Sequence, residues 1–130
     1  MSTSEVVTRG VRVKVESQFS PDHSDPREHR FFFVYTIRIS NEGDATVQLI
    51  NRHWIITDAN GRIEEVRGPG VVGKQPILKS GESFEYSSGC PLRTRFGSMY
   101  GEYEMLIVDT GERFDATIAP FPLRLSGTFN

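Results

Sequence analysis

The feature that most constrains the fold of this chain is a repeated alternation of apolar and polar residues that never gives way to a helical period. Val11, Val13 and Val15 alternate with charged residues, which is the pattern of a half-buried strand. Further segments of strand character cover 30–41, 47–58, 62–67, 77–78, 83–88, 96–109, 114–118 and 121–125. Seven or more short strands separated by turn sequences predict an all-β fold, an antiparallel β-sandwich of the immunoglobulin or fibronectin type III kind.

The sequence shows no internal repeat and no linker, so we expect a single domain that spans residues 1–130. Its 15 basic and 17 acidic residues leave a net charge of −2, which provides no general attraction to nucleic acid or to an anionic membrane. The longest aromatic and apolar run, residues 31–35, is far too short to cross a bilayer. We therefore expect neither nucleic-acid binding nor membrane insertion.

The sequence also indicates a compartment. Residues 1–5 contain neither the basic segment nor the apolar segment of a secretory signal. Cys90 is the only cysteine, which excludes an internal disulfide and cysteine-based zinc sites. Together these observations predict a cytoplasmic protein.

Two local patterns predict details of the sandwich. Asn60-Gly61 lies between two apolar strands, which predicts a hairpin with a type I′ turn, because both central residues of that turn need a positive φ. Residues 101–105 resemble the sequence around the tyrosine corner of immunoglobulin domains, with Tyr103 as the tyrosine and Met105 in place of the cysteine.

Residues 68–76, here called the glycine loop, form the densest group of glycines and prolines in the chain. Three glycines with G-x-G-x-x-G spacing precede a lysine, a glutamine and a proline. Glycine allows a positive φ and the close approach of a ligand or of another backbone segment. We therefore expect the functional site here. The candidate binding residues are Arg67, Gly68, Gly70, Gly73, Lys74 and Gln75.

The glycine loop does not fit either familiar nucleotide motif. A dinucleotide-binding fold needs a helix after the glycines, and Pro76 disfavours that helix. A P-loop needs Ser or Thr after the lysine, and this chain has Gln75. Two interpretations stay open: glycine N–H groups form an anion-binding nest, with Lys74 or Arg67 adding positive charge, or the glycines only allow a tight crossover between strands.

A second polar loop, residues 22–29, contains three carboxylates and two histidines. Imidazole suits Zn, Co or Ni, and carboxylates suit Mg. The candidate metal ligands are His23, Asp25 and His29, although their spacing matches no known metal motif and the loop also fits a solvated connection. His53, beside Trp54 in a strand, is interpreted as a structural histidine or one at the rim of a site.

The sequence offers little for catalysis. It contains no G-x-S-x-G motif, and Cys90 has no recognisable histidine partner. The segment 87–91 fits the end of a strand. No pair of carboxylates is singled out as a general acid and base. We therefore favour a protein that is not an enzyme.

Several segments of the chain resemble the ApaG (CorD) family, the DUF525-type domain. They are the glycine loop with Arg67, the residues Leu78, Gly81, Phe84, Tyr86, Cys90-Pro91-Leu92, Gly97, Met99 and Gly101, and the earlier segments 11–13, 33–39, 52–56 and 58–61. The resemblance covers essentially the whole chain. It implies a fibronectin type III-like sandwich and a small bacterial protein linked to cobalt tolerance and magnesium efflux. Related domains in eukaryotic F-box and polymerase-interacting proteins favour a protein partner.

These observations lead to three hypotheses about function. The preferred one is a non-enzymatic binding module that contacts a protein partner in divalent-cation homeostasis. The alternatives are a pyrophosphate- or nucleotide-binding protein and a phosphohydrolase, both using the glycine loop. The candidate bound groups are a divalent cation, Co²⁺ or Mg²⁺, and a nucleotide phosphate. Exposed edge strands would also permit a dimer.

Overall fold

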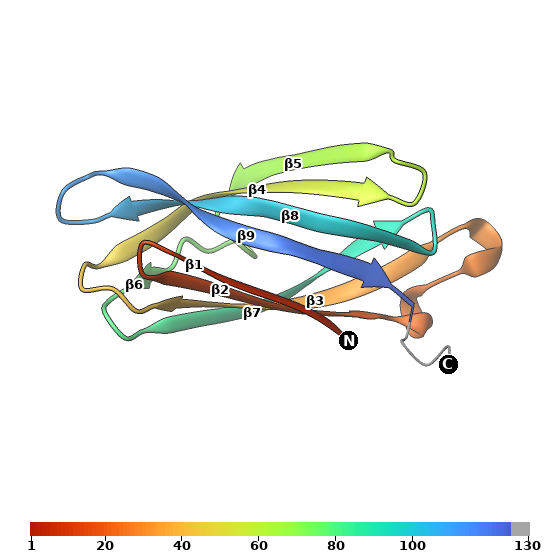
Figure 1. Cartoon of the computed structure of the whole chain (residues 1–130), viewed down its shortest axis with the longest axis horizontal. Coiled ribbons are helices and arrows are strands. Elements are labelled where there is room, and N and C mark those ends of the chain that lie inside the picture. Colours follow the sequence, from red (N-terminus) through yellow and green to blue (C-terminus); the bar gives the residue numbers. More distant parts are fainter. Residues whose placement is uncertain (126–130) are drawn as a thin grey trace.

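The computed structural model describes residues 1–125 and shows two antiparallel β-sheets packed face to face (Figure 1). The four-stranded sheet has the order β1-β2-β3-β7, formed by β1 (Ser2–Thr8), β2 (Val11–Phe19), β3 (Phe31–Asn41) and β7 (Ser83–Leu92). The five-stranded sheet has the order β5-β4-β8-β9, with β6 beside β4. Its strands are β4 (Val47–Asp58), β5 (Ile63–Pro69), β6 (Ile77–Leu78), β8 (Phe96–Ile107) and β9 (Arg113–Arg124). The predicted all-β sandwich is confirmed.

The core lies between the two sheets and is built by the predicted alternation. Val13 and Val15 on β2 pair with Ile39 and Ile37 on β3, and all four side chains are fully buried. Trp54 of β4 is buried as well. Its ring packs edge-on against Tyr35 of the opposite sheet and Phe121 of β9, with centroid distances of 5.5 and 5.9 Å. Aromatic pairs in this arrangement add to the stability gained from burial.

The two sides of the sandwich differ. On one side β1 lies against β9, where the Ser4 hydroxyl donates to the carbonyl of Ala119 at 2.9 Å and the Thr117 amide donates to the Thr8 hydroxyl at 3.1 Å. The remaining edge strands are β5 and β7, one from each sheet. A cleft lies between them, lined by Glu64 and Val66 of β5 and by residues 88–91 of β7. The sandwich is therefore closed at β1 and β9 and open at β5 and β7.

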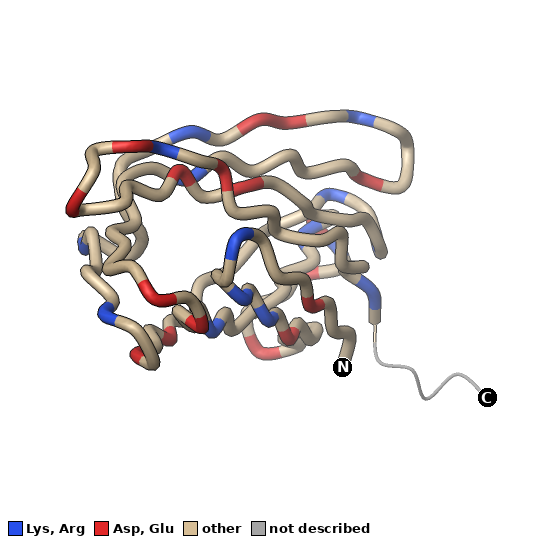
Figure 2. The backbone as a smooth tube through the Cα atoms, turned by 60° about the vertical axis from the view of Figure 1, so that its left-hand side comes forward, with Lys and Arg blue, Asp and Glu red and all other residues tan. Residues whose placement is uncertain are grey.

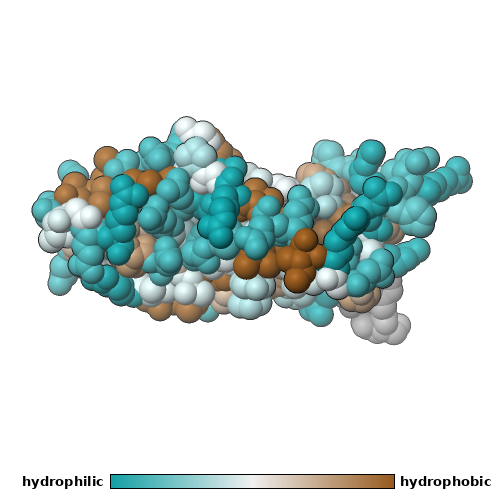
Figure 3. All heavy atoms as spheres, turned by 90° about the horizontal axis from the view of Figure 1, so that it is seen from above, coloured by the Kyte–Doolittle hydropathy of each residue, from teal (hydrophilic) through white to brown (hydrophobic). Residues whose placement is uncertain are grey.

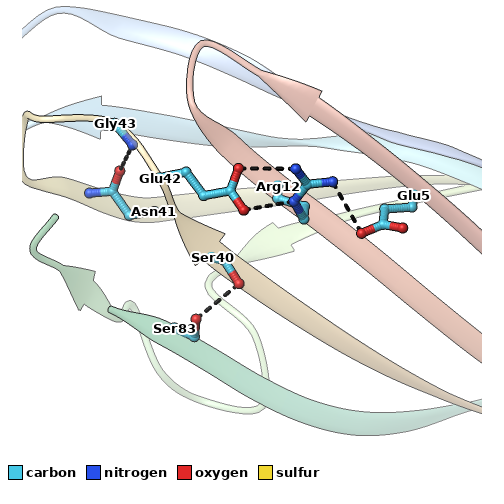
Figure 4. A network of polar contacts seen from close by, with 7 residues as sticks. All are labelled: Glu5, Arg12, Ser40, Asn41, Glu42, Gly43 and Ser83. Carbon is cyan, nitrogen blue, oxygen red and sulfur yellow. Dashed lines mark hydrogen bonds and ion pairs between the residues drawn. The ribbon is translucent and has the colours of Figure 1, made fainter. Parts of the chain in front are cut away.

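The outer face of the four-stranded sheet carries exposed ion pairs. Arg12 of β2 contacts Glu5 of β1 at 3.1 Å and Glu42, just after β3, at 2.7 Å (Figure 4). The same view shows the Asn41 side chain turned towards the amide of Gly43, which donates to it at 3.0 Å. Acidic and basic residues are interspersed over both layers (Figure 2). Exposed pairs of this kind contribute little to stability, and we assign the Arg12 pairs a structural role.

Four expectations about strands and turns were incomplete or wrong. β1 was not predicted, because its inward positions include Ser2, Ser4 and Thr8 and so lack apolar alternation. The segment 87–91 forms the last part of a strand as predicted, but the strand expected over 83–88 was too short, since β7 continues to Leu92. The Tyr103 hydroxyl bonds the hydroxyl of Tyr86 instead of making the backbone contact of a tyrosine corner.

The turn type at Asn60-Gly61 was also predicted wrongly. Only Gly61 of the two has a positive φ, of 82°. The Asp58 amide donates to the carbonyl of Arg62 at 3.0 Å, and the Asp58 carboxylate accepts from the amides of Asn60 and Arg62, both at 2.9 Å. The connection is thus a three-residue loop that ends in a left-handed glycine, a common alternative to the two-residue turn.

Among residues 1–125 no helix is long and apolar enough to span a membrane. The helical turns are two short 3-10 segments, Pro21–His23 and Pro26–Glu28.

Candidate functional site

The tip of the glycine loop is a two-residue hairpin turn. Val71 and Lys74 exchange backbone hydrogen bonds of 2.8 and 2.9 Å, and between them Val72 and Gly73 have φ values of 45° and 77°. Positive φ at both central positions defines the type I′ family of turns. The loop is therefore ordered backbone without a helix, as the position of Pro76 predicted.

Gly70 is the glycine that the loop geometry needs most. Its φ is 59°, and a Cβ atom there would lie 2.2 Å from the carbonyl oxygen of Lys74. Its amide donates to the carbonyl of Ile50 on β4 at 2.8 Å. Gly70 is buried, so it fixes the path of the loop and is not open to a ligand.

Arg52 of β4 holds the beginning of the loop. Its Nη1 atom donates to the carbonyl oxygens of Pro69 and Gly70 at 2.9 and 3.0 Å. Arg52 pairs with Gly68 across the β4–β5 ladder. The sequence did not identify Arg52 as a loop-holding residue. Its contacts with the loop depend on the pairing of β4 with β5, and composition does not reveal that pairing.

Gln75 anchors the far end of the loop. Its side-chain amide donates to the carbonyl of Ile50 at 2.9 Å, and its own carbonyl accepts from the side chain of Gln48 at 3.1 Å. The Leu49 amide bonds the carbonyl of Pro76 at 3.0 Å. The whole loop is thus fastened to β4.

The structure separates the six predicted site residues into three groups of two. Arg67 and Gly68 belong to β5 and line a groove on the outer face of the five-stranded sheet. Gly73 and Lys74 are exposed at the tip, beside Val72, whose side chain is 55% exposed. Gly70 and Gln75 hold the loop in place. Three of the loop amides that an anion-binding nest could use are already engaged, since those of Gly70, Val71 and Lys74 donate within the protein.

The groove has a volume of about 410 Å³ and carries charges of both signs. It lies on the face seen from above in Figure 3, where the surface is mostly hydrophilic with small separate hydrophobic areas. The lining side chains come from four neighbouring strands, and the main polar ones are Asn51, His53, Arg67, Glu102, Glu104 and Asp115.

His53 joins three strands at the centre of this face. Its Nε2 atom lies 3.0 Å from Glu65 of β5, and its Nδ1 atom contacts Glu102 of β8. The hydrogen bond with Glu65, followed by that with Glu102, raises the pKa of His53 above its ordinary range, and the same contact lowers the pKa of Glu65. Two carboxylates thus hold His53 in place while it lines the groove, and this position fits both a structural histidine and one at the rim of a site.

The candidate metal ligands occupy separate positions. The His23 Nδ1 atom lies 2.8 Å from the Ser20 hydroxyl, and its ring lies 5.6 Å from that of Phe32. Asp25 pairs with Arg30 through backbone bonds, and His29 is exposed with a φ of 53°. Residues 1–125 contain no group of three or more His, Cys, Asp or Glu side chains that could hold a metal ion.

Cys90 is buried between the sheets. Burial raises the pKa of its thiol to about 12, and the negative charge of Glu64 acts in the same direction. A thiol that stays protonated is a poor nucleophile. Fold and site together define a small antiparallel β-sandwich that presents a rigid glycine loop beside a charged groove.

Comparison with known proteins identifies the family. The model of the ApaG domain matches residues 21–107. Protein ApaG of Anaeromyxobacter dehalogenans (strain 2CP-C) is 55% identical over 130 residues, which cover 100% of both chains. Protein ApaG of Anaeromyxobacter sp. (strain K) is 56% identical over the same coverage. The crystal structure of the ApaA protein from Bordetella pertussis has a TM-score of 0.87 at 47% identity and covers 91% of this chain and 95% of that chain.

The chain belongs to the ApaG family. The resemblance inferred from the glycine loop and its flanking strands is thereby confirmed. The binding roles of the loop residues and the metal-ligand roles of His23, Asp25 and His29 stay predictions.

Proposed function

We propose that this chain is a non-enzymatic binding module that contacts a protein partner through the tip of the glycine loop. The main support for the proposal is the backbone conformation of Val72. A β-branched residue with a φ of 45° is a clear conformational outlier, and such strain costs about 1–3 kcal/mol. The side chain is 55% exposed, so packing within the domain offsets little of that cost.

Residues held in strained conformations concentrate at functional sites. An asparagine or glycine would suit the first position of this turn better. The chain instead presents an apolar side chain there, on a loop that Arg52, Gln75 and Gly70 fasten to β4. An ordered loop loses little conformational freedom on binding, which favours its use as a recognition surface.

The family resemblance suggests what kind of partner binds the loop. Its link to cobalt tolerance and magnesium efflux suggests a partner that acts in divalent-cation homeostasis. The related domains of eukaryotic F-box and polymerase-interacting proteins support a protein as the ligand.

The test compares retention of partners by immobilised protein. Val72→Asn relieves the strain and removes the apolar group, so the domain should stay folded and lose the partners that bind the tip. Val108→Asn is the matched control, because Val108 is also an exposed apolar residue outside the loop, 44% exposed. Retention of every partner by Val72→Asn would refute the proposal.

Binding of pyrophosphate or a nucleotide is the second candidate. It is favoured by the exposure of Lys74 beside Gly73, where an added Cβ atom would meet nothing within 4 Å. In this case side-chain charges would act in place of the engaged amides. Calorimetry with pyrophosphate and ATP, with and without Mg²⁺, should then give heat that Lys74→Gln removes. Phosphate release in the same samples would indicate a phosphohydrolase.

A further inference from the structure

The cleft between β5 and β7 opens into the space between the two sheets and shares only Arg52 with the outer groove. It has a volume of about 250 Å³. Its walls are mostly apolar or aromatic and include Tyr35, Trp54, Ile56, Val66, Cys90 and Met99. By comparison, a dry cavity of about 150 Å³ is enough to bind benzene. The cleft can therefore take a ligand somewhat larger than one aromatic ring.

Arg52 also lines this cleft, and some of its N–H groups have no acceptor among the described residues. Its Nη1 atom is engaged with the loop carbonyls, but no described residue accepts a hydrogen bond from Nε or Nη2. Every fully buried side-chain nitrogen or oxygen in residues 1–125 has a hydrogen-bond partner. The unused nitrogens must therefore be accessible to a ligand or to solvent.

A guanidinium group beside apolar walls favours a particular class of ligand. Its paired N–H groups match the two oxygens of a carboxylate, and a low-polarity surrounding strengthens that contact. The negative charge of Glu64, which also lines the cleft, works against an anion. One arginine opposed by one glutamate favours a singly charged carboxylate over a phosphate dianion.

We infer that this cleft binds a monocarboxylate carried on a small apolar body, with the carboxylate on Arg52 and the apolar group against Trp54 and Val66. The same chemistry is offered by a free apolar acid and by the C-terminal residue of a peptide. The inference does not depend on the partner of the glycine loop, and Val72→Asn should leave it unchanged.

Trp54 is the only tryptophan of the chain, so its fluorescence reports on the cleft directly. We would titrate the full chain with 3-phenylpropionate, with its amide, and with a tripeptide that ends in a free phenylalanine. If the cleft binds the carboxylate, we expect a saturable change of Trp54 emission with the acid and none with the amide. Binding of the tripeptide as well would identify a peptide terminus as a competent source, and binding of the free acid alone would identify a small metabolite.

Two variants test the assignment without removing Arg52. Val66→Phe should fill the cleft and abolish the change. Glu64→Gln should tighten binding about threefold or more, because it removes a like charge from the wall. Glu85→Gln on the outer face of β7 is the control and should bind like the unmodified protein. Equal binding of acid and amide, no saturable change, or tightening by Glu85→Gln as large as by Glu64→Gln would overturn the inference.

Discussion

The guanidinium of Arg52 occupies the space that a side chain on Gly68, its partner on the neighbouring strand, would need. A Cβ atom at Gly68 would come within 2.9 Å of Nη2 and 3.0 Å of Cζ. Because Gly68 has no side chain, the guanidinium can occupy this position and reach the carbonyls of Pro69 and Gly70. Gly68, the first glycine of the motif, therefore leaves the space in which Arg52 holds the loop.

Gly68→Ala should push the guanidinium away and release the start of the loop. Hydrogen bonds to charged groups contribute about 1.5–3 kcal/mol, and part of this should be lost from the free energy of unfolding measured in urea. Exchange of the Gly70 amide with deuterium should also become faster. Gly43→Ala is the control, because the nearest atom to its Cβ lies at 3.5 Å. Equal stability of the two variants would show that Arg52 is not displaced.

Gly70 and Gly73 should respond to substitution very differently, although both have positive φ. Gly70→Ala places a Cβ 2.2 Å from the carbonyl of Lys74 and forces the backbone to move, so we expect a loss of more than about 2 kcal/mol. A Cβ atom at Gly73 meets no atom within 4 Å, and asparagine suits this turn, so Gly73→Asn should be tolerated. Its stability should stay within about 0.5 kcal/mol of the starting protein. Thermal unfolding followed by circular dichroism would compare them, and similar losses would contradict the turn geometry.

The contacts of His53 with Glu65 and Glu102 should make stability depend on pH in a defined direction. The pKa of His53 is raised above its ordinary 6.5, so its contribution is complete below pH 6.5 and disappears as pH rises through the folded-state value. The pKa of Glu65 is lowered from 4.5, so its contribution is present above pH 4.5 and is lost as pH falls through its folded-state value. The pair should therefore stabilise the domain most between these two ordinary values.

Urea unfolding of the starting protein and of His53→Gln would measure this effect. The difference in stability should be larger at about pH 5.5 than at about pH 8.5. A nuclear magnetic resonance titration should place the pKa of His53 above its ordinary value, and Glu65→Gln should bring it down. A stability difference that is the same at both pH values would contradict the assigned contacts.

The sequence predicted the layers better than the contacts between them. Period-two alternation identified β2, β3 and β8, because most of their inward positions are apolar, with Ser17 and Asn41 as buried polar exceptions. β1 escaped prediction because its burial comes from packing against β9, which shields its serine and threonine side chains. Local alternation reveals positions where apolar side chains are buried. It does not reveal polar side chains that a strand distant in the sequence covers.

The non-helical backbone of the glycine loop was predicted correctly, but the separate structural roles of its glycines were not predictable. The spacing of the glycines could not distinguish Gly70, which meets Lys74, from Gly73, which stands in open space. Nor could it show that Gln75 turns back to Ile50. These roles follow from the register of β5 and β6 on β4, and register is a property of the folded sheet.

Tyr86 and Tyr103 bring two hydroxyl groups together between the sheets, and this pair gives the sharpest test of the packing. The hydroxyls contact each other, and burial raises the pKa of both side chains. Tyr86→Phe should leave the Tyr103 hydroxyl buried without its partner, which costs about 1–3 kcal/mol. Replacing both tyrosines by phenylalanine removes the two polar groups together, so the double variant should be less destabilised than the sum of the single ones. A double-mutant cycle from urea unfolding measures this coupling, and additive losses would show that the two hydroxyls do not depend on each other.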